Sequence, residues 1–509
     1  MTHTSASSSR FARWMPRIGI AVAALCVMVG AVLLIEQLAF ESFGLARYDA
    51  RLYWTVGRGI LRGLIPYRDL FETKPPGIFL ISALSFWLRG DASVGTWAQV
   101  AVLGIVPVAV SCVLLHRYPK HLVLAWCCAL LSIALTLYTA DRSGRFQVES
   151  FGSCFIVLYA CILAWNDAPL GSKRLFAAAA CLLCGIGLKE PFILTAFAVA
   201  LFLRPRDAAR SFFLPLFMGG VAGGIILLWT GYADPYVNIY LRHMIGEQVQ
   251  SRGSPIIRGL DVPRMLGDVW DYSRPLYWSI VLAGIAQVAL LWRKTDARDA
   301  ITSLLLGTYL LSIAVGTGVM YFHHHFVFAV PGYIALFLAL LANTARSEWR
   351  LRPLHAAALA LVVACTFSLH ANTPYRAVVL AERETSEQQR DAAVVDALLD
   401  ACGRSQYLYV GKHVDTIYAY TQHLPLGPIF AQATLMRPIG DFAEPFLENI
   451  GRADLIIVGD HDRLEAAAEE YMDAHFSEVP WTCAEPYASR LSRYDLLYRT
   501  AEPSYSKNI

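Results

Sequence analysis

The chain has 509 residues, of which 56% are apolar and 16% are charged, and its formal net charge is +3. Soluble domains usually carry about 25% charged residues, so this composition excludes an ordinary soluble protein. The small net charge gives no indication of a nucleic-acid-binding protein. With a mean hydropathy of +0.45, the chain is predicted to be an integral membrane protein.

The first long apolar run, residues 18–39, predicts a retained membrane-spanning helix. It reaches the length of about 20 residues that a span needs, and no small-residue cleavage site follows it. Arg10, Arg13 and Arg17 precede it and predict a cytoplasmic N-terminus. Ten further runs are interpreted as spans: 93–115, 121–138, 150–165, 175–188, 191–203, 211–230, 275–292, 300–319, 325–342 and 354–370.

Two interpretations of residues 175–203 compete, a helical hairpin and one long tilted helix. Positive charge prefers cytoplasmic loops, and the hairpin places every basic connection on that side if residues 76–89 do not cross. These connections are 116–121, 166–174, 204–210, 292–299 and 346–353. The favoured topology has about eleven spans, a cytoplasmic N-terminus and an extracytoplasmic C-terminus. Residues 76–88 then form a re-entrant or membrane-surface helix.

After residue 371 the composition becomes more polar, which predicts a small extracytoplasmic α/β domain. Helices are expected at 382–403 and 462–476, and strands at 405–411, 454–460 and 492–500. The predicted domains are therefore a membrane domain, residues 1–370, with a first outer loop at 40–92, and the α/β domain, residues 371–509.

Cysteines fall into two groups. Nine lie in apolar runs and are interpreted as core thiols, a metal or redox role for Cys181 and Cys184 being the less favoured alternative. Cys402 and Cys483 lie in the polar region. They are a candidate disulfide if that region faces an oxidising compartment.

The chemically rich connections all fall on the outer side of the predicted topology. Asp49 lies about ten residues after the first span and is a candidate general base, the alternative being a solvated loop acid paired with an arginine. His243 and Glu247 stand four residues apart and could share a divalent metal with Glu72, although a hydrogen-bonded pair is favoured. Lys189 belongs to an ionisable pair at membrane level, which indicates a functional site.

The motifs of the outer connections resemble a known family. Tyr48-Asp49-Ala50 after the first span, and 66-PYRDLFETKPPG-77, resemble the GT-C glycosyltransferases of the family 39/83 type. That group includes protein O-mannosyltransferases, the aminoarabinose-to-lipid-A transferase and bacterial galacturonosyltransferases. Lys189-Glu190-Pro191 and the histidine run at 323–325 are similar to further family motifs. Two departures are Thr73, inserted between Glu72 and Lys74, and Ala50 in place of a second acid, which argues against a protein O-mannosyltransferase proper.

The resemblance implies an inverting transfer of a sugar from a polyprenyl-phosphate donor. Asp49 would deprotonate the acceptor hydroxyl, and cations would stabilise the departing phosphate. The donor-phosphate candidates are Lys74, Arg145, Lys189, His323 and His324, a proton relay being the rival role for the histidines. Candidates to hold a divalent metal ion or the acceptor are Glu72, Asp141, His243 and Glu247.

These observations predict a hexosyl- or pentosyltransferase in the bacterial cytoplasmic (inner) membrane. Its partners would be the polyprenyl-phosphate sugar, the bilayer and an envelope lipid, polysaccharide or protein as acceptor, with no nucleic acid. A membrane transporter or lipid flippase is the first alternative, although no inverted repeat is visible. A scaffold that binds envelope partners is the second, and it leaves the charge of loop 40–75 unexplained.

Overall fold

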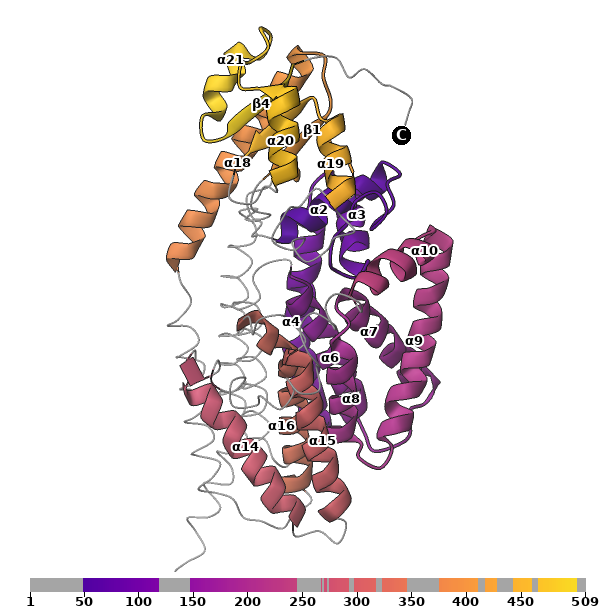
Figure 1. Ribbon diagram of the computed structural model, residues 1–509. Helices are drawn as coiled ribbons and strands as arrows, with labels where there is room; N and C mark the ends of the chain where they lie inside the picture. Colours follow the sequence, from indigo (N-terminus) through magenta and orange to yellow (C-terminus); the bar gives the residue numbers. More distant parts are fainter. Residues whose placement is uncertain are drawn as a thin grey trace, which may run out of the picture. The chain divides into compact units, whose positions relative to one another are not determined.

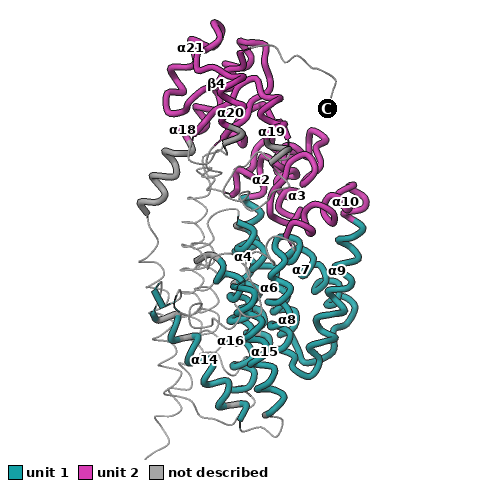
Figure 2. The backbone as a smooth tube through the Cα atoms, viewed as in Figure 1, with its two compact units in different colours: residues 1–42, 96–225, 253–374 teal, residues 43–95, 226–252, 375–509 magenta. Residues whose placement is uncertain are grey.

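The computed structural model describes residues 49–118, 147–244, 267, 270–271, 274–292, 297–316, 323–345, 375–410, 417–427, 443–459 and 466–500. The chain forms two compact units (Figure 2). Unit 1 contains residues 1–42, 96–225 and 253–374, and unit 2 contains residues 43–95, 226–252 and 375–509. This division differs from a single boundary at residue 370, because the first outer segment is grouped with the C-terminal segment.

Between residues 93 and 345, the described helices other than the short α10 (Ala233–Pro235) and the π-helix η1 (Tyr236–Leu241) follow the apolar runs of the sequence (Figure 1). They are α4 (Ser93–Arg117), α6 (Val148–Ala164), α7 (Ser172–Leu188), α8 (Phe192–Leu203), α9 (Ala208–Thr230), α14 (Arg274–Trp292), α15 (Ala297–Gly316) and α16 (Val330–Ala345), the last preceded by the 3-10 helix η2 (His323–Ala329). Among the described residues, four stretches are long and apolar enough to cross a membrane: Ser93–Leu114, Ala208–Thr230, Arg298–Gly316 and His325–Thr344. The predicted spans at 18–39, 121–138 and 354–370 lie outside the described residues.

Helices α7 and α8 form a hairpin, and contacts with α6 fix their directions. At the start of α7, Arg174 donates to the carbonyl of Ile162 near the end of α6, at 2.8 Å. Just after α7, Lys189 Nζ lies 4.0 Å from Glu149 Oε1 in the first turn of α6. Arg204, just after α8, again donates to the end of α6, at the carbonyl of Leu163. Therefore α7 runs antiparallel to α6 and α8 runs parallel to it, as the loop charge indicated.

One cavity of unit 1 is lined by residues from the basic connections. Arg117, Asp167, Arg204 and Asp299 come from four of these connections, and Asn343 comes from the end of α16, shortly before the fifth. These connections therefore meet at one end of the unit, which is the arrangement that the positive-inside tendency requires. Their cytoplasmic location remains a prediction.

Unit 2 contains a four-stranded sheet of order β1-β2-β4-β3, with β1 (Tyr407–Val410), β2 (Leu455–Val458), β3 (Phe476–Ser477) and β4 (Asp495–Arg499). Strand β1 pairs parallel to β2, and β4 pairs antiparallel to both β2 and β3. Helices α18 (Tyr375–Ala401), α19 (Ala443–Arg452) and α20 (Ala466–His475), the short α21 (Glu485–Ala488) and the 3-10 helix η6 (Ser489–Leu491) accompany the sheet. Leu408 and Ile456 of the sheet pack with Ile450 of α19 and Met472 of α20.

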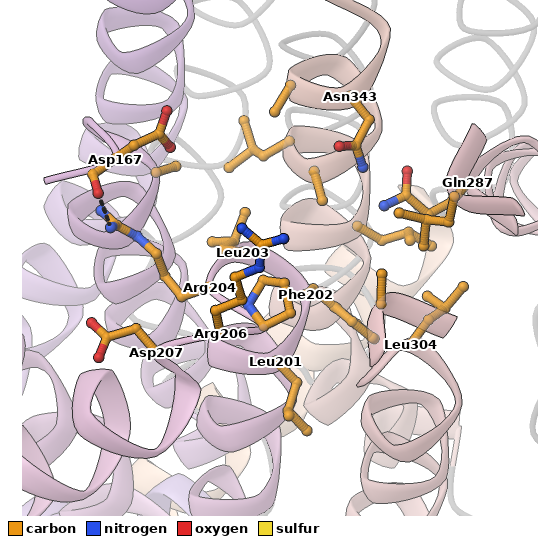
Figure 3. A pocket seen from close by; sticks show the side chains of 18 of the residues that line it. Asp167, Leu201, Phe202, Leu203, Arg204, Arg206, Asp207, Gln287, Leu304 and Asn343 are labelled. Atoms are coloured by element: carbon orange, nitrogen blue, oxygen red, sulfur yellow. Dashed lines mark hydrogen bonds between the residues drawn. The ribbon is translucent and has the colours of Figure 1, made fainter. Parts of the chain in front are cut away.

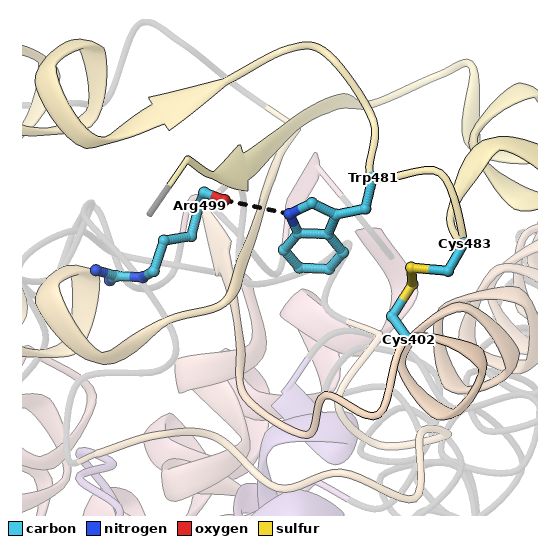
Figure 4. The surroundings of a disulfide bond; sticks show 4 residues. All are labelled: Cys402, Trp481, Cys483 and Arg499. Carbon is cyan, nitrogen blue, oxygen red and sulfur yellow. Dashed lines mark hydrogen bonds between the residues drawn. A yellow bond between two sulfur atoms is a disulfide. The ribbon is translucent and has the colours of Figure 1, made fainter. Parts of the chain in front are cut away.

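A disulfide joins Cys402 and Cys483, the pair singled out from the sequence, with their Cα atoms 5.4 Å apart (Figure 4). It connects the residue after α18 to the segment before α21. In the same segment, Trp481 Nε1 donates to the carbonyl of Arg499 in β4, at 3.1 Å. The disulfide thus joins the end of α18 to the segment that Trp481 attaches to β4.

The first outer segment forms two packed helices of unit 2, α2 (Asp49–Leu61) and α3 (Gly77–Arg89). A Cβ on Gly57 of α2 would lie 2.6 Å from the Cβ of Ser82 in α3, so a glycine is needed where the two helices approach. Helix α3 exposes Trp87, 71% accessible, together with Leu84 and Leu88. This exposed apolar face suits the membrane-surface helix that the sequence predicts.

Candidate active site

Lys74 lies between two carboxylates that come from different parts of the first outer segment. Its Nζ is 3.9 Å from Asp49 Oδ2 and 3.6 Å from Glu72 Oε1. Asp49 is the first residue of α2, where the helix dipole favours a negative charge, and Tyr53 OH, one turn further on, donates to Asp49 Oδ2 at 3.3 Å. Asp49, Glu72 and Lys74, three residues selected from the sequence, are therefore brought together.

The two acids differ in their environment. The side chain of Glu72 is 2% exposed, whereas that of Asp49 is 29% exposed. Glu72 Oε1 accepts hydrogen bonds from the Thr73 backbone N–H at 2.9 Å and from Thr73 Oγ1 at 3.2 Å. The residue that departs from the family motif, Thr73, therefore holds Glu72 in place. Glu72 is the buried neighbour of Lys74, and Asp49 is the more accessible of the two acids.

Tyr67 supports Lys74 from a strained backbone position. Its φ is 69°, in the left-handed region that a tyrosine rarely adopts. The ring is 1% exposed and lies 4.8 Å from the ring of Tyr240 and 6.0 Å from that of Phe79, measured between centroids. Its hydroxyl donates to the backbone carbonyl of Lys74 at 2.8 Å. Such strain costs of the order of 1–3 kcal/mol and persists only where surrounding contacts fix it, so the aromatic cluster determines the path of the chain into Lys74.

The far end of α2 is attached to the C-terminal segment of the same unit. Arg58 donates to the carbonyls of Tyr418 and Ala419, both at 3.1 Å, and Trp54 packs edge-on against the ring of Tyr420. Burial, followed by the charge of nearby Arg62, lowers the pKa of Arg58. The helix that begins at Asp49 is thus held at both ends.

Asp396 of α18 holds the adjoining turn. Both of its carboxylate oxygens accept the backbone N–H of Gln422, at 3.0 and 2.9 Å. Burial raises the pKa of this carboxyl group, and the hydrogen bond from Gln422 opposes that shift. The turn that receives Arg58 is therefore fixed from α18 as well.

Unit 1 contains a second polar group, around the ion pair of Lys189 with Glu149. Glu149 is 2% exposed, and its Oε2 has no hydrogen-bond partner among the residues that the structure describes. Next to it in the sequence, Ser150 Oγ accepts a hydrogen bond of 2.5 Å from Gln99 Nε2 of α4. Lys189 was selected from the sequence, whereas Glu149 was not among the candidate site residues. The burial of Glu149 in the first turn of α6 marks it as a candidate, and the sequence alone does not show this burial.

Of the other candidate residues, His243 contacts an aromatic ring, and most of the rest are not described by the structure. The ring of His243 packs edge-on against Phe71, with centroids 5.2 Å apart. Asp141, Arg145 and Glu247, and the side chains of His323 and His324, lie outside the described residues. Within the described part of the chain, no three His, Cys, Asp or Glu side chains gather to hold a metal ion. Of the candidate metal ligands, Glu72 lies beside the Lys74 ammonium, and Asp141 and Glu247 are not described, so a metal site remains a prediction.

Solved structures provide a comparison for the fold. The crystal structure of ArnT from Cupriavidus metallidurans bound to undecaprenyl phosphate matches with a TM-score of 0.53 at 13% identity, over 94% of this chain and 98% of ArnT. The apo structure of the same protein matches with a TM-score of 0.54 at 11% identity, over 93% and 97% of the two chains. The chain has the ArnT fold.

The likeness to ArnT extends over almost the whole of both chains, so it includes the helical part and the C-terminal part together. It confirms, for the fold, the resemblance that the outer motifs indicated. The protein is a polytopic helical membrane protein of the ArnT type. No protein-family model matches the chain, and no curated protein matches it significantly.

Proposed function

We propose that this protein is an inverting glycosyltransferase that moves a sugar from a polyprenyl-phosphate donor to an envelope acceptor at the outer face of the bacterial inner membrane. The observation that carries the proposal is the position of Lys74 between Asp49 and Glu72. It is supported by the ArnT fold, since one ArnT structure contains undecaprenyl phosphate. The acceptor is a lipid, a polysaccharide or a protein, and the sugar is a hexose or a pentose.

The proposed reaction is a single displacement in which Asp49 is the base. The acceptor hydroxyl oxygen attacks the anomeric carbon and its proton passes to Asp49. The bond from that carbon to the phosphate oxygen breaks, and polyprenyl phosphate leaves with the electron pair. The contact of 3.9 Å between Lys74 and Asp49 is long for an ion pair, so the ammonium can turn to the phosphate at little cost.

Glu72 positions Lys74 during this exchange. Because the carboxylate is buried and bonded to Thr73, it stays in place while the ammonium moves. Lys189, Arg145, His323 and His324 remain proposed phosphate ligands. Asp141, His243 and Glu247 remain proposed acceptor or metal ligands, and turnover with and without a chelator tests the metal.

The test is sugar release by the purified protein from a panel of labelled polyprenyl-phosphate sugars, with an envelope extract as acceptor. Asp49→Asn keeps the size of the side chain and removes the base, so we expect turnover to fall about 10²- to 10⁴-fold while donor binding survives. Asp473→Asn, an exposed acid of α20 in the same unit, is the matched control and should not change turnover.

Two outcomes would contradict parts of the proposal. Turnover that survives in Asp49→Asn would remove Asp49 as the base. A folded protein that neither binds nor turns over any donor would contradict the transferase. Transport of a labelled lipid in proteoliposomes would then be measured for the alternative function.

A further inference from the structure

Unit 1 contains a cavity of about 460 Å³ at the end where α6 and α8 finish (Figure 3). Much of its wall is apolar and comes from leucine, phenylalanine and alanine side chains of α8, α14, α15 and α16. Its polar residues come from the basic connections and the adjoining helix ends. An apolar wall beside charged helix ends is the environment of a lipid headgroup with the start of its chains.

Two arginines that line the cavity already form hydrogen bonds or an ion pair with other residues of the protein. Arg204 donates to the carbonyls of Leu163, at 2.9 and 3.1 Å, and of Asp167, at 2.9 Å. Arg117 donates to the carbonyl of Ala164 at 2.6 Å and forms an ion pair with Asp167. These carbonyls belong to the end of α6, where helical partners are missing. Arg117 and Arg204 therefore cap α6, and these donors are directed at the helix end.

The charged groups that line the cavity are three cations and three acids. Beside Arg117, Arg204 and Asp167 these are Arg206 and Asp207, which follow α8, and Asp299 in the first turn of α15. Hydrogen bonds to carbonyls leave the charges of Arg117 and Arg204 in place, so the lining as a whole is neutral. A ligand that carries only negative charge is disfavoured by this balance, and one that carries both a cation and a phosphate fits it.

Gln287 of α14 supplies an acceptor that the described residues leave unused. It is 4% exposed and lines the cavity, and its Oε1 has no hydrogen-bond partner in the described part of the chain. In Figure 3 its amide lies beside that of Asn343, across the cavity from Asp167 and Asp207. A buried acceptor without a hydrogen-bond partner is destabilising, and an N–H donor of a ligand would satisfy it.

We propose that this cavity binds a phospholipid whose headgroup carries a primary ammonium, as phosphatidylethanolamine does. The ammonium donates to Gln287 Oε1 and to Asp299, the phosphate meets Arg206, and the acyl chains follow the apolar wall. A choline headgroup has no N–H donor for Gln287, and a glycerol headgroup has no cation, so its phosphate would add a net negative charge to a neutral lining. The site would lie on the predicted cytoplasmic side, and it does not depend on the proposed function.

The test measures lipid retention by native mass spectrometry on the full-length protein purified in mild detergent. The protein is titrated in turn with phosphatidylethanolamine, phosphatidylcholine and phosphatidylglycerol. We expect tighter binding of phosphatidylethanolamine than of the other two by about tenfold, the value of one good hydrogen bond. Gln287→Leu should abolish the preference, and Arg206→Gln should weaken binding. Arg210→Gln, an exposed arginine of the same connection outside the cavity, is the control and should change nothing.

Equal retention of the three lipids, or an unchanged preference in Gln287→Leu, would overturn the proposal. If Gln287→Leu does not fold, Gln287→Glu takes its place, since it keeps an acceptor and adds a negative charge. That variant should bind phosphatidylethanolamine at least as tightly as the wild type. Weaker binding by a folded Gln287→Glu protein would also contradict the site.

Discussion

Lys74 has two carboxylate neighbours with different freedom to move. Glu72 is buried and bonded twice to Thr73, whereas Asp49 is 29% exposed and contacts Lys74 at 3.9 Å. A buried charge without its partner is costly, so the ammonium is held chiefly by Glu72. This difference fits the proposed roles of Asp49 as the base and of Glu72 as the residue that positions Lys74. A variant at Glu72 tests the second role separately from the first.

We predict that Glu72→Gln lowers kcat and tightens donor binding. The amide keeps the acceptor for Thr73 but removes a negative charge 3.6 Å from Lys74 Nζ. The donor phosphate then meets less repulsion, while Lys74 moves toward Asp49 and makes it a weaker base. We expect a change of about tenfold in each quantity, equivalent to about 1.4 kcal/mol. Steady-state kinetics measure kcat, and a titration with undecaprenyl phosphate measures the affinity for the donor lipid.

The matched control for that variant is Glu485→Gln, which changes an exposed acid of α21 in the same unit. It should leave both quantities unchanged. A Glu72→Gln protein that binds the donor more weakly would show that Glu72 contacts the donor or a metal, and would contradict the positioning role.

Some of the site could be predicted from individual residues and some could not. Asp49 stands out as an acid soon after the first span, and Glu72 and Lys74 stand out because their motif resembles that of the GT-C glycosyltransferases. The roles of Thr73 and Tyr67 could not be predicted, since they depend on side-chain contacts and on a positive φ that no residue type announces. The pairing of Glu149 with Lys189 joins residues from different helices, and one sequence does not indicate it.

At the scale of elements, α2 connects the site to the C-terminal segment of unit 2. Asp49 begins this helix, and Arg58, nine residues later, holds two carbonyls of the turn that follows β1. Any displacement of that turn therefore reaches the helix that carries the proposed base. The C-terminal segment therefore helps to position α2 and, with it, Asp49.

We predict that Arg58→Gln destabilises unit 2 and loosens the turn at 417–422. The shorter amide cannot reach both carbonyls, and loss of these hydrogen bonds should lower the free energy of unfolding by about 1–2 kcal/mol. Hydrogen–deuterium exchange should rise in peptides covering 417–422. Arg62→Gln, an exposed arginine one turn further along, is the control. Unchanged exchange in Arg58→Gln would show that the two carbonyl contacts are not important for the turn.

Hydropathy predicted the described helices of unit 1 well, because each predicted span that the structure describes is a helix with nearly the expected bounds. Three strands of the sheet were also predicted, since short β-branched or aromatic runs flank turns there. Helix α2 was interpreted as a loop, because its charges hid the buried face of Leu52, Tyr53 and Val56. Strand β3 is only two residues long and has no pattern strong enough to predict it, and helix α19, although amphipathic, was not predicted.

At the scale of the whole molecule, the positions of the basic connections support the predicted topology. Connections that follow α4, α6, α8 and α14 contribute to one cavity of unit 1, which agrees with the hairpin of α7 and α8. Counting charges predicted this grouping. The grouping of residues 43–95 with 226–252 and 375–509 was not predicted, because it depends on contacts between distant segments.

The orientation is tested by thiol labelling of intact cells with an impermeant maleimide. We predict that Arg68→Cys, at a side chain 57% exposed, is labelled from outside. Arg206→Cys, also at an exposed position, should be labelled only after the cells are permeabilised. The wild-type protein gives the background from its own cysteines. Labelling of both variants, or of Arg206→Cys alone, in intact cells would contradict the topology.

Unit 2 is assembled from an early, a middle and a late segment of the chain, and this determines when the site can exist. Helix α2 emerges early in synthesis, but its partners at 418–419 emerge far later. At about 5–20 residues per second, the 360 residues that separate Arg58 from Tyr418 take about 18–72 s. During that time the proposed base lacks the support that Arg58 provides. A nascent chain in the membrane therefore has no complete site, and the last segment to be translated completes it.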